Sequence, residues 1–148
     1  MSDLRELYQE VIIDHTKRPR NFYKIELPTH TAEGFNSLCG DRLTLYLQVQ
    51  NDTIQEVSFE GSGCAISTAS SSLMTEILKG KTLQEAEKLF TIFHTLLTGQ
   101  DNKEDLPEIG KLQVLAGVKA YPSRVKCATL AWHTFQAALN GGQCVSTE

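Results

Sequence analysis

Hydrophobic residues near the start of the chain recur with the spacing of an amphipathic helix. They follow the i, i+3, i+4, i+7, i+8 pattern that gathers side chains on one face: Leu4, Leu7, Tyr8, Val11 and Ile12. Asp3 with Glu6 is a capping pair for the N-terminus of this helix, and Pro19, within a basic run, ends it. The pattern predicts a helix over residues 3–15, followed by an extended or looped segment over residues 21–38.

The pattern then changes to strict alternation, which indicates a half-buried β-strand. The apolar residues of this strand occupy positions 43, 45, 47 and 49. Asn51 and Asp52 form a two-residue turn candidate between this strand and a return strand that carries Val57. Ile54 has the opposite parity to Val57, which predicts a β-bulge at residues 55–56. We expect a hairpin with one face directed towards helices.

The second half of the chain returns to helical spacing. Thr82 and Glu85 form a capping box for one helix, and residues 100–105 form a polar loop. The predicted helices run from Cys64 to a cap at Gly80 and over residues 83–97, 112–118 and 125–139. The order of helix, strands and helices predicts an α+β fold. In this fold the helices pack on one face of a small antiparallel sheet of about three strands.

Composition places the chain among ordinary globular proteins. Its 148 residues fit a single domain over residues 1–148, and 41% apolar with 22% charged residues argues against a disordered, collagenous or coiled-coil protein. The net charge of −4 disfavours nucleic-acid binding, which needs an excess of Lys and Arg. No apolar run approaches the ~20 residues of a membrane helix, and the charged N-terminus lacks a signal-peptide core. We therefore expect a cytoplasmic protein.

The four cysteines are the feature that composition does not explain. A disulfide framework is not expected in a cytoplasmic chain of this length. The thiols are therefore inert core residues, reactive groups or metal ligands. Cys144 follows two glycines in a polar tail, and we interpret it as an incidental thiol.

The other three cysteines lie at the boundaries of predicted elements. Cys39 is in a glycine turn before a strand, Cys64 directly precedes a helix, and Cys127 lies in the first turn of the last helix. A helix N-terminus favours the thiolate over the thiol. The nearby cations Arg124 and Lys126 also favour the thiolate.

Asp41 adds an oxygen ligand two residues from Cys39, on the same side of a strand. Three thiolates and one carboxylate would make a four-coordinate site suited to Zn²⁺. The cysteine spacings match no short zinc-finger pattern, so buried inert thiols remain an alternative on spacing alone.

Other polar groups have ordinary structural explanations. The hydroxyl-rich residues 67–72 provide a small-residue face for helix packing, since no histidine lies near them in the sequence. His94 and His133 lie within helices, where structural roles are common. A cation is favoured at the helix C-terminus that carries His15. The basic residues at positions 17, 18 and 20 form a solvated turn or a docking patch.

Four ordered segments carry motifs of a known family. They are Leu7-Tyr8 with Ile13-Asp14-His15 and Pro19-Arg20-Asn21, then Asn36-Ser37-Leu38-Cys39-Gly40-Asp41, then Gly61-Ser62-Gly63-Cys64-Ala65-Ile66-Ser67-Thr68-Ala69-Ser70, and finally Arg124-Val125-Lys126-Cys127-Ala128-Thr129-Leu130-Ala131-Trp132. In these motifs, over nearly its full length, the chain resembles the IscU/SufU family of iron–sulfur cluster assembly proteins. The resemblance implies an IscU/NifU-N-like fold and four metal ligands: Cys39, Asp41, Cys64 and Cys127.

The SufU branch is the closer resemblance. Scaffold-type members have His where this chain has Lys126, and a chaperone-binding Leu-Pro-Pro-Val-Lys where residues 120–124 read Ala-Tyr-Pro-Ser-Arg. Extra residues at about 91–111 are also typical of the SufU branch.

The resemblance implies a zinc-bound sulfur acceptor, a sulfurtransferase-type accessory protein rather than a stand-alone catalyst. Cys39 would take persulfide sulfur from a SufS-type cysteine desulfurase, after a desulfurase histidine replaces it on the zinc. Downstream iron–sulfur scaffold or acceptor proteins would receive the sulfur. The metal would stay bound to Asp41, Cys64 and Cys127. The cations Arg124 and Lys126 would support these ligands or dock the partner.

Two alternatives remain open. The same ligands would serve a scaffold that assembles and transfers a transient [2Fe–2S] cluster. They would also serve a structural-zinc interaction module without sulfur chemistry.

Overall fold

The computed structural model describes residues 2–98, 107–141 and 144–146. Along the chain the elements are α1 (Ser2–Lys17), β1 (His30–Asn36), β2 (Asp41–Gln50), β3 (Thr53–Ser62), α2 (Ala65–Leu78), α3 (Leu83–Thr98), the 3-10 helix η1 (Pro107–Ala120), α4 (Pro122–Leu139) and β4 (Cys144–Ser146). Within these ranges, none of the helices has the length and hydrophobicity that a membrane span requires. The predicted polar loop over residues 100–105 lies outside the described residues.

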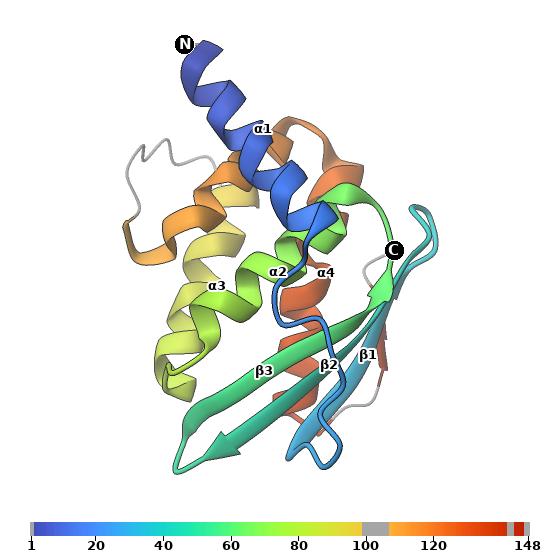
Figure 1. The fold of residues 1–148 in the computed structure, drawn as a ribbon, viewed down its shortest axis with the longest axis vertical. Coiled ribbons are helices and arrows are strands. Elements are labelled where there is room, and N and C mark those ends of the chain that lie inside the picture. Colours follow the sequence, from blue (N-terminus) through green and yellow to red (C-terminus); the bar gives the residue numbers. More distant parts are fainter. Residues whose placement is uncertain (1, 99–106, 142–143, 147–148) are drawn as a thin grey trace.

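The predicted α+β fold is confirmed. β1, β2 and β3 form an antiparallel sheet, and the full strand order is β3-β2-β1-β4. Figure 1 shows α4 lying across the back of the sheet, with α2 and α3 on the same side. The core fills the space between these layers, and its largest fully buried side chains include Trp132, Phe93 and Phe135.

The central hairpin follows its sequence pattern closely. Asn51 and Asp52 have positive φ angles of 54° and 60°, the conformation that a two-residue hairpin turn requires. Gln48 pairs with Glu56 and the next residue, Val49, pairs with Ile54. The intervening residue of β3 is therefore the predicted bulge, which restores Val57 to the core face.

The sequence pattern predicted about three strands but located only two, and β1 and β4 are the strands that it did not locate. β1 lies within the segment predicted as extended or looped, and its buried residues are Ala32, Gly34 and Asn36. Since none is a large apolar residue, the alternation of buried and exposed positions cannot be recognised from the sequence of this strand. β4 lies in the predicted polar tail and pairs in parallel with β1, where exposed Cys144 is opposite Glu33. Backbone hydrogen bonds make this pairing without needing an apolar pattern.

The helices match their predictions with two differences at the boundaries. The capping box is formed, since the Glu85 N–H donates to Thr82 Oγ1 at 3.1 Å and the Thr82 N–H donates to Glu85 Oε1 at 2.9 Å. The predicted helix over 112–118 is part of the 3-10 helix η1, which has a kink at Gly110. α4 begins at Pro122 rather than at residue 125, because proline is favoured in the first turn.

α4 packs against β1 without space for a side chain at Gly34. A Cβ atom at this position would lie 2.0 Å from Thr134 Oγ1. The hydroxyl donates to the Leu130 carbonyl at 2.8 Å and is buried, so it is not free to move aside. Glycine therefore sets the distance between the last helix and the sheet.

A buried polar network fastens the end of α1 to α2. His15 is buried, and its Nδ1 lies 2.7 Å from Ser72 Oγ, which also accepts from the Arg20 N–H at 2.8 Å. Arg20 forms an ion pair with Asp14 at 2.6 Å, and His15 Nε2 lies 3.7 Å from Glu76. His15 has the ordinary structural role expected of it, but burial and the nearby Arg20 guanidinium lower its pKa, against the charged form that a helix C-terminus favours. Ser72 does have a histidine partner, from a distant part of the chain.

Gly34→Ala should destabilise the protein by about 1–3 kcal/mol, because the added methyl group overlaps Thr134. Urea unfolding measures the change, and the double variant with Thr134→Ala should recover part of it. Gly117→Ala is the matched control, since nothing lies within 4 Å of its Cβ position. Equal stabilities of the two single alanine variants would contradict the packing argument.

Stability should fall as the pH drops below the ordinary histidine pKa of 6.5, partly through His15. Its pKa in the folded state is lowered by burial, Arg20 and Lys111, against the opposing effects of Glu76 and Asp14. The unfolded chain therefore binds more protons as pH falls, which favours unfolding. Urea unfolding between about pH 7.5 and pH 5.5 should show a flatter dependence for His15→Gln than for wild type. If the unfolding free energies of wild type and His15→Gln changed equally with pH, His15 would not contribute to the pH dependence.

Candidate metal centre

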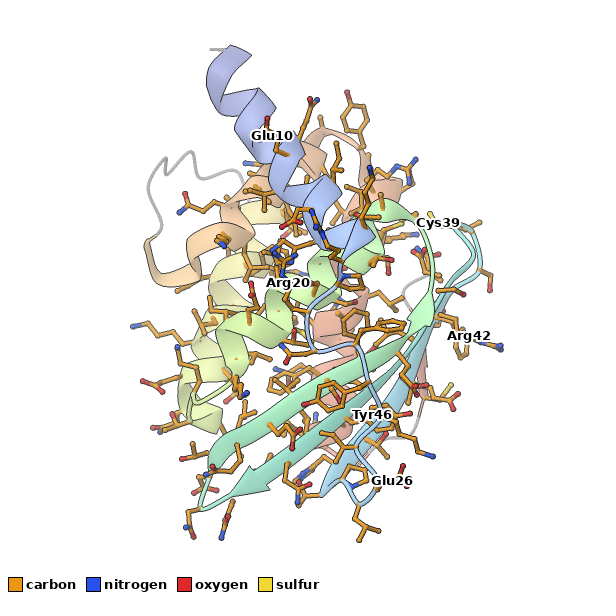
Figure 2. All side chains as sticks on the ribbon, in the orientation of Figure 1. Glu10, Arg20, Glu26, Cys39, Arg42 and Tyr46 are labelled. Carbon is orange, nitrogen blue, oxygen red and sulfur yellow. The ribbon has the colours of Figure 1, made fainter. Side chains whose placement is uncertain are left out.

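Three elements converge on the predicted ligands. Cys39 lies in the turn between β1 and β2, at the tip seen in Figure 2, and Asp41 is the first residue of β2. Cys64 is the N-cap residue of α2. Cys127 lies in the second turn of α4 rather than the first, because this helix begins earlier than predicted.

The ligand atoms of three of these residues are close together. One ligand atom each from Cys39, Asp41 and Cys127 lies within 4.8 Å of the other two. Cys127 Sγ is 2.9 Å from Cys39 Sγ. Cys64 lies beside this group, with its Sγ 4.0 Å from Asp41 Oδ2. The structure thus brings all four predicted ligands to one place, with Cys64 at its margin.

Asp41 is fixed by the loop before α2. Its Oδ1 accepts a hydrogen bond from the Cys64 N–H at 2.8 Å. A Cβ atom on Gly63 would lie 2.7 Å from this oxygen, so glycine is needed for the close approach. The glycine-rich segment before Cys64 therefore serves to admit a carboxylate.

The Cys64 thiol caps α2. Its Sγ accepts from the Ser67 N–H at 3.4 Å, which satisfies one of the unpaired amides of the first turn. A sulfur atom in this position meets the positive end of the helix dipole.

Burial separates the cysteines into two kinds. Cys127 is 0% exposed and Asp41 is also buried, whereas Cys39 and Cys64 are partly exposed. Burial first, and then hydrogen bonding with Cys39 and Asp41, raises the pKa of the Cys127 thiol. The cluster therefore needs positive charge if its members are to be ionised together.

Asn36 is a member of the site that the sequence analysis did not single out. Its buried side chain donates from Nδ2 to Cys127 Sγ at 3.8 Å, while its Oδ1 accepts from the Leu38 N–H at 3.2 Å. It joins the turn that carries Cys39 to α4. Its position directly before the Cys39 turn was the sequence feature that could have pointed to it.

The two predicted cations both lie near the start of α4. The exposed Arg124 guanidinium is close enough to the thiols of Cys64, Cys127 and Cys39 for their negative charge to raise its pKa. Lys126 is half-buried and directly precedes Cys127. Cys144, on β4, is not part of the cluster.

The donor set fits a thiophilic metal. Three sulfur atoms and one carboxylate oxygen are the ligands that Zn²⁺ and iron–sulfur centres use in proteins. A divalent cation would also offset the charge that makes a desolvated cluster of thiolates unfavourable.

Comparison with known proteins places the chain in a family. The profile of the family described as "NifU-like N terminal domain" matches residues 7–128. The iron-sulfur cluster assembly scaffold protein IscU of Streptococcus pyogenes is 40% identical over 94% of this chain and 86% of its own length. The zinc-dependent sulfurtransferase SufU of Bacillus subtilis is 36% identical over 91% of this chain and 90% of its own.

A solved structure shows the same fold. It is that of a candidate iron-sulfur cluster assembly scaffold protein for the SUF system from Fervidobacterium islandicum, with a TM-score of 0.83 and 40% identity. The match covers 91% of this chain and 98% of that one. The chain therefore belongs to the NifU-like N-terminal domain family and is a homologue of IscU and SufU proteins, as its four motifs predicted.

Proposed function

We propose that this protein is a zinc-bound sulfur acceptor in iron–sulfur cluster assembly. Cys39 receives persulfide sulfur from a SufS-type cysteine desulfurase and passes it to a downstream scaffold or acceptor protein. The observation that carries the proposal is the convergence of a partly exposed Cys39 with buried Asp41 and Cys127. The 36% identical relative named a zinc-dependent sulfurtransferase supports the same activity.

Cys39 is the thiol best placed to accept sulfur. It lies in a turn, so it can move without disturbing a helix or strand, whereas Cys127 is enclosed in α4 and Cys64 caps α2. The neighbouring Leu38 is 72% exposed, and Tyr121 at the start of α4 is 62% exposed. These apolar side chains offer contact area for a partner at the site.

The ligands that would hold zinc are Cys39, Asp41, Cys64 and Cys127. When bound, zinc supplies positive charge that keeps buried thiols ionised at neutral pH. Arg124 adds positive charge from the solvent side of the cluster, and Asn36 donates a hydrogen bond to the Cys127 sulfur. Asp41, Cys64 and Cys127 keep their positions when Cys39 turns outward.

The sulfur transfer is a thiol–disulfide type of exchange. The Cys39 thiolate attacks the outer sulfur of the desulfurase persulfide, and a new S–S bond forms on Cys39. The S–S bond of the persulfide breaks, and the desulfurase cysteine leaves as a thiolate. One sulfur atom moves and no external oxidant or reductant is needed.

Cys39→Ser should lose nearly all persulfide formation and all stimulation of a SufS-type desulfurase, because its hydroxyl is a poor sulfur nucleophile. Incubation with the desulfurase and cysteine, followed by intact-mass analysis, detects the added sulfur. Cys144→Ser is the matched control and should behave as wild type. Full stimulation by Cys39→Ser would contradict the acceptor role. A wild-type protein that never gains sulfur would favour the structural-zinc module.

The second candidate is a scaffold for a transient [2Fe–2S] cluster. It is favoured by the same cysteine-rich donor set and by the 40% identical relative named a scaffold protein. Anaerobic incubation with iron, cysteine and desulfurase separates the two functions. A visible cluster spectrum that transfers to an apo-acceptor would support the scaffold, and zinc retention with a Cys39 persulfide would support the acceptor.

Zinc removal should lower the melting temperature by roughly 5–15 °C, because metal that binds the folded state alone contributes its binding energy to stability. Melting of the zinc-containing protein with and without a chelator measures the change. The chelator should lower the melting temperature of Asp41→Ala by less than that of wild type. It should lower the melting temperature of Cys144→Ser by as much as that of wild type. An unchanged wild-type melt would exclude a metal bound to this fold.

A further inference from the structure

A pair of histidines lies on the helices away from the cysteine cluster. His94 on α3 and His133 on α4 have ring centroids 6.0 Å apart and ring planes at 80°. His133 follows Cys127 by six residues, about 9 Å along the helix axis. The Phe90 ring contacts both imidazoles, with centroid distances of 5.8 Å to His94 and 5.6 Å to His133. The Phe90 ring thus packs against both imidazole rings.

Both imidazoles have a ring nitrogen that a ligand could use. Each residue is partly exposed, and neither is ion-paired with a carboxylate of the described residues. His94 Nδ1 lies 3.4 Å from Thr98 Oγ1, which leaves Nε2 for another partner. Burial, and next the neighbouring His94, lower the pKa of His133, so protonation competes weakly with a ligand at neutral pH.

We propose that His94 and His133 form a second metal site, for a divalent first-row transition ion such as Ni²⁺ or Zn²⁺. Imidazole is a preferred donor for these ions. Two imidazoles that share one ion at metal–nitrogen distances of about 2.0–2.1 Å have ring centres roughly 4.5–5.2 Å apart. The observed separation of 6.0 Å is larger by about 1 Å, so the two side chains turn towards each other when the ion binds, and water completes the coordination. Two ligands bind more weakly than the four of the cysteine cluster.

The site has a built-in optical reporter. Trp132 is the single tryptophan of the chain and precedes His133. The Phe90 ring that contacts both histidines also stacks on Trp132, with a centroid distance of 6.0 Å and an angle of 25°. A bound paramagnetic Ni²⁺ ion should therefore quench Trp132 fluorescence.

The test is titration of the untagged full chain, in its metal state as purified, with NiCl₂. Tryptophan fluorescence should fall along a saturable curve that fits one ion per chain. His94→Gln and His133→Gln should each weaken binding at least tenfold. His30→Gln is the matched control, because His30 lies at the start of β1 next to Thr29, and it should bind as wild type. Native mass spectrometry should show one nickel ion added without loss of the metal already present.

Two results would overturn the proposal. One is unchanged nickel binding in both His94→Gln and His133→Gln. The other is nickel that enters only by replacing the metal of the cysteine cluster. Neither result bears on sulfur transfer to Cys39, so the proposed function and this site are tested separately.

Discussion

The close contact between α4 and β1 is the constraint on which the candidate metal centre depends. Gly34 allows Thr134 to approach the strand, and Cys127 lies seven residues earlier on the same helix, about 10 Å along its axis. Asn36, two residues beyond Gly34, meets the Cys127 sulfur there. The depth at which the helix sits on the sheet therefore decides where its thiol lies. A rigid helix and a rigid strand position the buried ligands, and a turn carries Cys39.

Electrostatics connects this geometry to the chemistry. A buried carboxylate and a buried thiol side by side are unfavourable when both are ionised, since little solvent is present to screen them. A cation in the cluster, with Arg124 at its edge, reverses the preference. The arrangement that would be costly in an empty protein becomes stabilising when a metal is present.

Local patterns predicted most of the fold, and distant contacts account for what they did not predict. The central hairpin, its bulge and the capping box at Thr82 involve neighbours in sequence or strong alternation. The position of β1 was not predicted because small or polar residues fill its inward positions. The contact between His15 and Ser72 joins residues 57 positions apart, and no local rule contains it.

The site shows the same division. The residue types and their places at element boundaries indicated a metal site, but spacing alone did not exclude inert thiols. The family motifs predicted the four ligands as a group. Asn36 opens one of these motifs, but its role was not predicted, because that role depends on α4 lying next to the turn. The pairing of His94 with His133 depends on how α3 and α4 are packed.

β4 has a consequence for how partners recognise this protein. It pairs with the outer edge of β1. At the free edge of β3, the Phe59 N–H donates to the Asn21 carbonyl and the Ile54 N–H donates to the Lys81 carbonyl. The edge strand beside β1 is therefore only three residues long, and β3 is bonded at two of its edge positions, which limits aggregation through open strand edges. It also disfavours partners that bind by adding a strand. Recognition would then rest on side chains of the turns and helices, and single substitutions could alter partner choice while leaving the sheet intact.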